Sequence, residues 1–297
     1  MLIRFGFEIE IETAEPVPML LALSTRPELA DDIVFEREIQ FSDELPTNTY
    51  LDRFGNRITR LVAPGGQLAI RSDGLIDAND AFDFQDLSAR QIPIPDLPDE
   101  VLQFLVASRY CDSDNLINDA WQLFKEVPEG GRRVQAITDY VHANVTFGYQ
   151  FGRANKTASE TFREKSGVCR DFAHLAISLC RAMNIPARYA SGYLGDIGVP
   201  YSGPGDFSAW FEVYLGDQWY TFDARHNQPR KGRIVMVRGA DAADVAMITS
   251  FGEHDLKYFA VWTDEIGVNQ GASELHRLMQ SRPKAEPLVF PSSARVA

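Results

Sequence analysis

A proline-rich segment divides this chain into two parts of different periodicity. Residues 91–98 read QIPIPDLP and contain three prolines. Proline lacks a backbone N–H and fixes φ, so regular helices and central strands do not continue through such a segment. Before it, apolar residues alternate with polar ones, whereas after it they recur at helical spacing. The chain is therefore expected to fold as two units, which fits its 297 residues.

The first unit has the pattern of a β-sandwich. In the segment from Leu2 to Glu12, four large apolar side chains fall on one face of a strand, at positions 5, 7, 9 and 11. Short strands at about this spacing, separated by Gly, Pro and Asn turns, are typical of sandwiches. We expect an N-terminal β-sandwich domain at 1–92. The other strands expected in it are 33–35, 49–51, 57–62 and 67–70.

The second unit combines helices with later strands. We expect a helical connector at 93–129, a core at 130–280 and an extended tail at 281–297, which contains three more prolines. The fold class is therefore α+β. Helices are expected at 99–107, 114–126, 132–144 and 169–183, and strands at 188–193, 209–215, 218–224 and within 232–262.

Charge and composition exclude several function classes. The net charge is −13, from 29 basic and 42 acidic residues, and this field repels nucleic acid and anionic lipid. No apolar run is long enough for a membrane span, and acidic residues interrupt the N-terminus where a signal peptide would be apolar. Three cysteines are a small and odd number, which does not fit a disulfide framework. We expect a cytoplasmic protein with no nucleic-acid or membrane partner.

One cysteine has a sequence context that points to chemistry. Cys169 follows Gly167 and opens a predicted helix. The first turn of a helix has unpaired N–H groups and the positive end of the helix dipole, and both favour a thiolate. The pKa of Cys169 is therefore expected below the ~8.5 of a free thiol. The other interpretation is a buried structural cysteine, which is what we expect of Cys111 and Cys180.

A hairpin supplies the second half of a candidate site. Gly216-Asp217 fits a two-residue loop, with Gly first as in a type II′ turn. This loop pairs Phe211 with Phe222 and puts Ser208 and Asp223 on one face, about 7–8 Å apart as diagonal neighbours. A base at 208 and a carboxylate at 223 would form an orienting pair for a thiol nucleophile.

These segments resemble a known family. GVCRDFAHLAISLCRAMNIPARYASGY followed by AWFEVYLGDQWYTFDAR is similar to the core of bacterial transglutaminase-like proteins, over roughly 130–240, and the region before it is similar to their N-terminal β domain. The resemblance implies a papain-like core and a Cys-His-Asp triad, with no cofactor or metal. It implies a protein or peptide substrate whose glutamine carboxamide or peptide carbonyl forms a thioester, followed by transamidation, deamidation or hydrolysis. Carried over, Cys169 is the nucleophile and Asp223 the orienter.

The sequence departs from the family at one position. Where the family has its histidine, just before Ala-Trp, this chain has Ser208. Serine is no base near neutral pH, and general-base help is worth about 10²–10⁴-fold. His226, three residues after Asp223, is the possible substitute base if the strand bends there; if not, it is a histidine packed in a loop. Two hypotheses follow: a cysteine enzyme with an altered triad, or a catalytically impaired relative used as a peptide- or protein-binding module.

Overall fold

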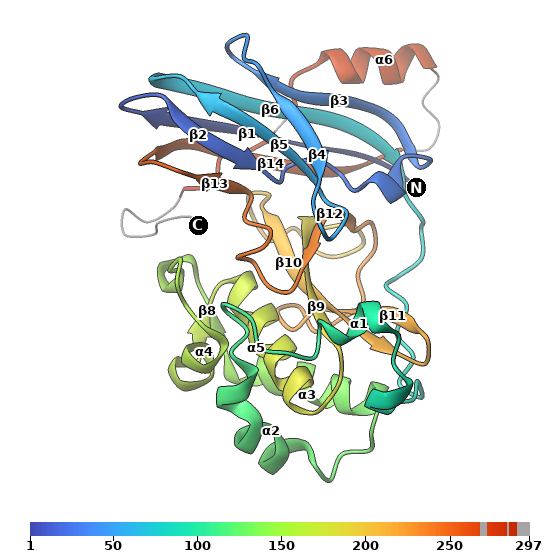
Figure 1. Ribbon diagram of the computed structural model, residues 1–297. Coiled ribbons are helices and arrows are strands. Elements are labelled where there is room, and N and C mark those ends of the chain that lie inside the picture. The colour runs from blue at the N-terminus through green and yellow to red at the C-terminus, as the bar shows by residue number, and fades with distance from the viewer. Residues whose placement is uncertain (268–271, 284, 290–297) are drawn as a thin grey trace.

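Three four-stranded sheets and a group of helices make up the structure (Figure 1). A computed structural model describes residues 1–267, 272–283 and 285–289. Two of the sheets form one end of the molecule together with helix α6, and helices α1–α5 form the other (Figure 1). The third sheet lies between them, so the chain alternates between a strand-rich region and a mixed core (Figure 1).

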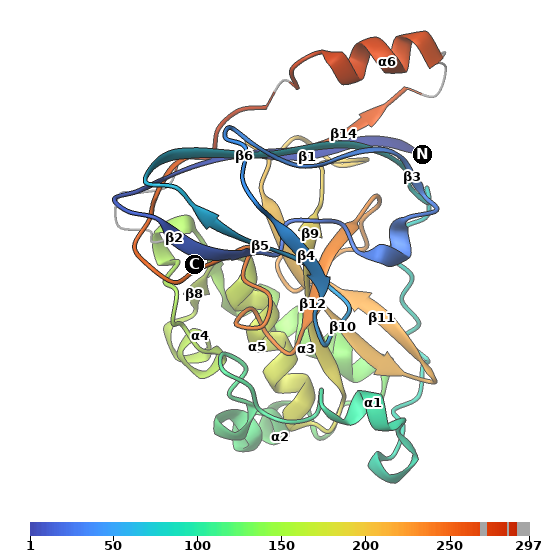
Figure 2. The same cartoon turned by 45° about the horizontal axis from the view of Figure 1, so that its top comes forward.

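The strand-rich region is the expected N-terminal sandwich. One sheet has the order β14-β1-β6-β3 and the other β13-β2-β5-β4, and Figure 2 shows them as two layers. Alternation in β1 puts Phe5, Phe7, Ile9 and Ile11 in the core, each at most 1% exposed. The N-terminal strands are β1 Leu2–Thr13, β2 Val17–Leu21, β3 Ile33–Phe41, β4 Asn48–Leu51, β5 Arg57–Ala63 and β6 Gly66–Asp77.

The last strands of the chain return to this sandwich. β13 (Ile248–Ser250) pairs with β2, and β14 (Asp255–Ile266) pairs with β1 along most of its length. The core was expected to extend over 130–280. In the structure, the strands within 248–266 pair instead with the first strands of the chain. Nothing local in the sequence specifies this partnership, because the paired residues are more than 200 positions apart.

The segment after β14 packs back on the outer side of the sandwich. Helix α6 (Ala272–Gln280) buries Met279 against Leu75 and Ile266 (Figure 2). Within the predicted tail, residues 281–283 and 285–289 form no helix or strand. In this tail, the N–H of Leu288 donates to the carbonyl of Phe259, 2.8 Å away. The remainder of the predicted tail lies outside the described residues.

The core contains an antiparallel sheet in the order β11-β10-β9-β12 and a central helix. Its helices and strands agree with the sequence pattern apart from α4, β7 and β8, which were not predicted, and a shorter α1. The helices are α1 Asp99–Leu102, α2 Ile117–Phe124, α3 Gly131–Asn144, α4 Ala158–Glu164 and α5 Cys169–Ala182. The strands are β7 Thr146–Phe147, β8 Ser166–Gly167, β9 Ala187–Tyr193, β10 Phe207–Leu215, β11 Gln218–Phe222 and β12 Ile234–Gly239.

Strand β10 is buried on both faces. Ala209 and Phe211 belong to the same apolar cluster as Phe172 and other side chains of α5. On the opposite face, Trp210 packs with Val235 and with residues near the sandwich. All nine residues of β10 are buried. In the middle of the strand, Ala209 and Phe211 thus lie on one face and Trp210 on the other, as a period of two requires.

The hairpin has the predicted register but a different turn. Phe211 pairs with Phe222, and Leu215 pairs with Gln218. Gly216 and Asp217 have φ angles of +51° and +75°. Two positive φ angles define a type I′ turn, so the expectation of type II′ was wrong.

No described helix combines the length and apolarity needed to cross a membrane.

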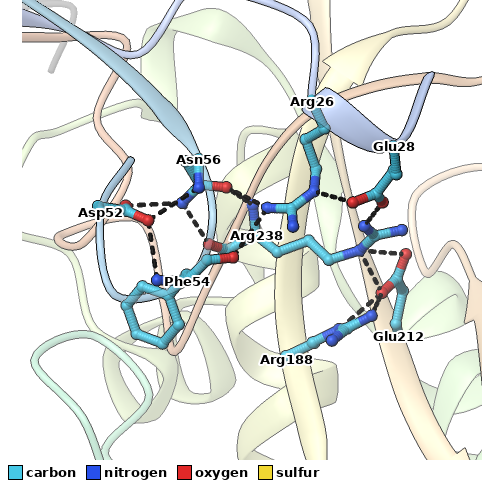
Figure 3. A network of polar contacts seen from close by, with 8 residues as sticks. All are labelled: Arg26, Glu28, Asp52, Phe54, Asn56, Arg188, Glu212 and Arg238. Carbon is cyan, nitrogen blue, oxygen red and sulfur yellow. Dashed lines mark hydrogen bonds and ion pairs between the residues drawn. The ribbon is translucent and has the colours of Figure 1, made fainter. Parts of the chain in front are cut away.

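A buried ionic network fastens the core sheet to the sandwich (Figure 3). Glu212 on β10 is 4% exposed and accepts hydrogen bonds from Arg188 on β9, at 2.7 Å, and Arg238 on β12, at 2.8 Å. Arg238 also contacts Glu28, which in turn pairs with Arg26 at 2.9 Å. Burial raises the pKa of Glu212, but the two arginines outweigh it and hold the pKa below its usual value.

The network then reaches the turn between β4 and β5. The side chain of Asn56 donates to the carbonyl of Arg238, 2.7 Å away, and its oxygen accepts the backbone N–H of the same residue at 2.8 Å. Asp52 holds Asn56 in turn through a 2.8 Å side-chain hydrogen bond. Polar groups from three core strands and two sandwich loops are therefore linked in one continuous set (Figure 3).

Replacing the buried carboxylate should destabilise the whole fold. The variant Glu212→Gln leaves two guanidinium groups without their shared counterion, which typically costs about 3–5 kcal/mol. We expect this loss in the free energy of unfolding measured in urea. Glu28→Gln is the matched control, because its partly exposed carboxylate should contribute at most about 1 kcal/mol. Equal losses in the two variants would contradict the assignment of Glu212 as the centre of the network.

Candidate active site

The start of α5 is fixed by a close approach of backbone and side chain. The parallel pair β7–β8 leads the chain to Gly167. A Cβ on Gly167 would lie 2.7 Å from Oδ2 of Asp171, so only glycine leaves space for this carboxylate. Asp171 is fully buried and accepts the N–H of Val168 at 2.9 Å. The carboxylate thus caps the helix and places Cys169 at its first residue.

Cys169 opens into a cavity of about 370 Å³. The residue is half-buried, whereas Cys111 and Cys180 are fully buried. Burial raises the pKa of Cys169 to about 11, and the negative charge of Asp206 adds to this effect. Arg225 and the backbone amide of Ala209 lower the pKa by less. The expected low pKa was wrong, because loss of hydration outweighs the favourable charges around the thiol.

Ser208 lies at the sheet end of the same cavity. It is buried on β10, and its backbone carbonyl accepts a hydrogen bond from the Ser191 hydroxyl at 2.9 Å. Its own Oγ is buried without a hydrogen-bond partner among the described residues. The predicted link between position 208 and Asp223 is therefore not formed by the serine, whose short side chain leaves this polar atom unsatisfied.

Asp223 instead holds His226. Strand β11 ends at Phe222, and the chain turns so that Oδ1 of Asp223 accepts the backbone N–H groups of Arg225 and His226, both at 3.0 Å. Oδ2 of Asp223 lies 2.9 Å from Nδ1 of His226 and 2.9 Å from Arg233. Burial would raise the pKa of Asp223, but Arg233 and His226 hold it well below its usual value. The carboxylate therefore stays ionised and orients the imidazole.

The bend after β11 is held from α3. Nδ1 of His142 lies 2.9 Å from the carbonyl of Arg225. Asn227 has a φ of +50° and donates from its side chain to Asp139 at 2.9 Å. These contacts explain why the strand does not continue straight, which would have pointed His226 away from Asp223.

Two cavities meet at the beginning of β10. Cys169 lines the smaller cavity, whereas His226 and Arg225 line a neighbouring one of about 530 Å³. His226 does not line the cavity of Cys169. Four residues line both: Tyr149, Asp206, Phe207 and Ser208.

Two of these shared residues were not identified from the sequence. Tyr149 lies in the short 3-10 helix Tyr149–Phe151 and donates its hydroxyl to Oδ2 of Asp206 at 2.8 Å. Burial raises the pKa of Asp206 to about 6, against the opposing effects of Tyr149 and Arg225. Extending the alternation of β10 back by two positions from Ser208 leads to Asp206, and this signal could have found it.

The loop after β12 closes the cavity of Cys169 and is held by a buried histidine. Nε2 of His174 accepts the N–H of Ala242 at 3.1 Å, and its ring stacks on Tyr110. Burial lowers the pKa of His174 to about 3, so it stays neutral. Among the described residues, no group of three or more His, Cys, Asp or Glu side chains could hold a metal ion.

Comparison with known proteins agrees with this architecture. The family model of the transglutaminase-like superfamily matches residues 122–224. An uncharacterized protein of Mycobacterium leprae is 25% identical over 209 residues, which are 66% of this chain and 73% of the relative. A second uncharacterized protein, from Mycobacterium tuberculosis, is 36% identical over 97 residues, or 29% of this chain and 31% of the relative.

The likeness to one solved structure extends over almost the whole chain. The crystal structure of a "putative cysteine protease" from Cytophaga hutchinsonii covers 91% of this chain and 92% of its own, with a TM-score of 0.82 and 29% identity. It therefore shares the strand-rich region as well as the core. At the level of the family, these relationships support a cysteine-type enzyme. Residues 122–224 thus match the transglutaminase-like superfamily, and the chain has a papain-like core preceded by an N-terminal β-sandwich.

Proposed function

We propose that this protein is a cysteine enzyme that cleaves or exchanges amide bonds through a thioester on Cys169. The observation that carries this proposal is the placement of Cys169, whose thiol lines a cavity at the first residue of a buried helix. Cys111 and Cys180 are fully buried and have no such access. Of the three thiols, only Cys169 can therefore meet a substrate.

The walls of the cavity indicate the acyl group. They are mainly aromatic and aliphatic side chains, so the cavity fits an apolar residue beside the reacting amide. A protein or peptide segment is the substrate class that offers such a residue together with a glutamine carboxamide or a peptide carbonyl. The apolar lining residues include Tyr110, Tyr189, Phe207, Val245, Met247 and Phe259.

The helix start serves the reaction rather than the resting thiol. N–H groups in the first turn of a helix lack intrahelical partners, and the dipole favours negative charge there. When the sulfur of Cys169 attacks a carbonyl carbon, the carbonyl oxygen gains this charge. The helix end does not lower the pKa of the buried thiol. It still stabilises the tetrahedral intermediate, because the negative charge of the intermediate develops at that position.

The pair of His226 and Asp223 belongs to the second half-reaction. Nδ1 of His226 is engaged by Asp223, which leaves Nε2 for proton exchange. His226 lines the neighbouring cavity, where water or an amine would enter. We propose that it activates this acceptor, which then attacks the thioester and releases the acyl group.

The alternative is a binding module on the same fold. It is favoured by Ser208, which stands where the family has its histidine and whose Oγ has no hydrogen-bond partner among the described residues, and by the raised pKa of Cys169. In this case the cavity would hold a peptide segment without reaction. The two functions differ in one respect that can be measured, which is whether Cys169 becomes acylated.

An activated ester should acylate Cys169. We expect incubation with p-nitrophenyl acetate to add one acetyl group, located by peptide mapping on the peptide that contains Cys169. The variant Cys169→Ala should gain none, because Cys111 and Cys180 are buried. Wild-type protein that stays unmodified, or is acetylated equally in both forms, would contradict the nucleophile and favour the binding module.

Removing the imidazole should slow deacylation. We expect His226→Ala to lower the steady-state release of acid at least tenfold while the acylation burst changes less than twofold, because His226 lines the cavity of the acceptor. His276→Ala on α6 is the matched control, since this histidine is exposed and remote from both cavities. A fall in the burst equal to the fall in turnover would instead assign His226 to the first half-reaction.

A further inference from the structure

We propose that Asp206 is the catalytic carboxyl group that accepts the proton of Cys169 and returns it to the leaving amine. The inference rests on the proposed thioester chemistry and names the proton carrier that Ser208 cannot supply. In the family pattern this task belongs to the position occupied by Ser208. Here it falls to the residue two positions earlier, on the segment that enters β10.

The first argument is location. Asp206 lines the cavity of Cys169, and it is the only carboxyl group among the described residues that do so. No described histidine lines this cavity. Asp206 also lines the neighbouring cavity of His226, so it borders the cavity of the thiol and that of the imidazole. A proton that leaves the sulfur has no other described carboxylate or imidazole to reach within that cavity.

The second argument is direct electrostatic interaction. The negative charge of Asp206 opposes thiolate formation at Cys169, so the two groups interact electrostatically across the cavity. Burial raises the pKa of Asp206 to about 6, while the hydroxyl of Tyr149 and the charge of Arg225 favour its ionised form. At neutral pH it is therefore a carboxylate that can accept a proton, and after acceptance it is an acid strong enough to protonate an amine.

The other buried carboxylates near the site are already engaged. Asp171 has its oxygens on the N–H of Val168 at 2.9 Å and on Arg170 at 3.5 Å, and it lines neither cavity. Asp223 is held by Arg233 and His226 and also lines neither cavity. Asp171 caps the helix and Asp223 orients His226, whereas Asp206 lines the cavity that Cys169 also lines.

The proton balance closes without a further reagent. The S–H bond of Cys169 breaks as the C–S bond forms, the proton passes to Asp206, and the carbonyl π electrons move to oxygen. When the intermediate collapses, the C–N bond breaks, its electron pair stays on nitrogen, and Asp206 donates the proton to that nitrogen. The amine leaves, the thioester remains, and Asp206 is a carboxylate again.

The test compares two leaving groups on one acyl group. N-acetyl-phenylalanine p-nitroanilide needs a proton on its leaving nitrogen, whereas the corresponding p-nitrophenyl ester releases a stable phenolate. We expect Asp206→Asn to lower turnover of the anilide at least 100-fold and that of the ester less than tenfold. Alkylation of Cys169 by iodoacetamide should be unchanged or faster, because a negative charge beside the thiol has been removed. A merely structural role would lower all three rates together.

Controls keep the inference separable from the proposed function. Asp217→Asn makes the same change at the far end of the β10–β11 hairpin, in an exposed turn, and should leave the ratio of the two substrates as in wild type. If Asp206→Asn also leaves that ratio unchanged, the assignment of Asp206 fails while thioester catalysis stands. If wild type turns over neither substrate and Cys169 is never acylated, the proposed function fails and the inference fails with it.

A second variant tests the same group through its pH dependence. Tyr149→Phe removes the hydrogen bond that favours ionised Asp206, so the pKa of the carboxyl group should rise. The groups that face Asp206 are Tyr149, Arg225 and Cys169, and only the first is changed. The acid limb of kcat/KM for the ester, near pH 6 in wild type, should move to higher pH. An unmoved limb would overturn the assignment.

Discussion

The carboxylate of Glu212 is the constraint on which the rest of the structure depends. It binds guanidinium groups from β9, which pairs with β10, and from β12, which lies beyond β9, and through Arg238 and Glu28 it reaches the sandwich. The register of β10 relative to β9, β12 and the sandwich is therefore fixed by ions that cannot be left unpaired once buried. Ser208 lies near the start of this strand and Asp206 directly before it, so the same network helps to fix their positions.

This attachment matters because the larger cavity has walls from both parts of the molecule. Trp262 and Thr263 of β14 line it together with Asp206 and His226. A core that shifted against the sandwich would change the shape of the space where an acceptor enters. The return of the final strands to the sandwich thus contributes directly to the candidate site.

The site has a buried thiol in place of a preformed thiolate. A helix start and Arg225 favour ionisation of Cys169, but burial dominates and raises its pKa to about 11. A family histidine at position 208 would stand next to this cavity, whereas the serine there makes no hydrogen bond through its Oγ within the described chain. The proposed mechanism therefore moves the proton during the attack and divides the work between Asp206 for the donor and His226 for the acceptor.

Local patterns in the sequence were sufficient for much of the fold. Alternation identified β1, helical spacing identified α5, and the two-residue loop identified the β10–β11 register. The spacing Thr157-x-x-Glu160 is that of a capping box and indicates the start of α4, but α4 was not predicted from it. The pairing of β14 with β1 has no local signal, because it joins opposite ends of the chain.

The site was less predictable than the fold, because its properties depend on burial and on contacts between segments that are distant in the sequence. Sequence placed Cys169 at a helix start, but its pKa depends on how deeply the folded cavity buries it. The contact of His226 with Asp223 depends on a bend that α3 holds from outside the hairpin. The role proposed for Asp206 involves a hydrogen bond from Tyr149, which lies 57 residues earlier in the chain.

The pH dependence of Cys169 alkylation is the most direct test of the central claim that the resting site holds a protonated, buried thiol. Iodoacetamide labelling with peptide mapping would follow Cys169, with Cys111 and Cys180 as internal references for buried thiols. We expect the rate at Cys169 to rise with pH through pH 9 without a plateau, in keeping with a pKa of about 11. A plateau with an inflection below about pH 8.5, the pKa of a free thiol, would show a preformed thiolate and contradict the account.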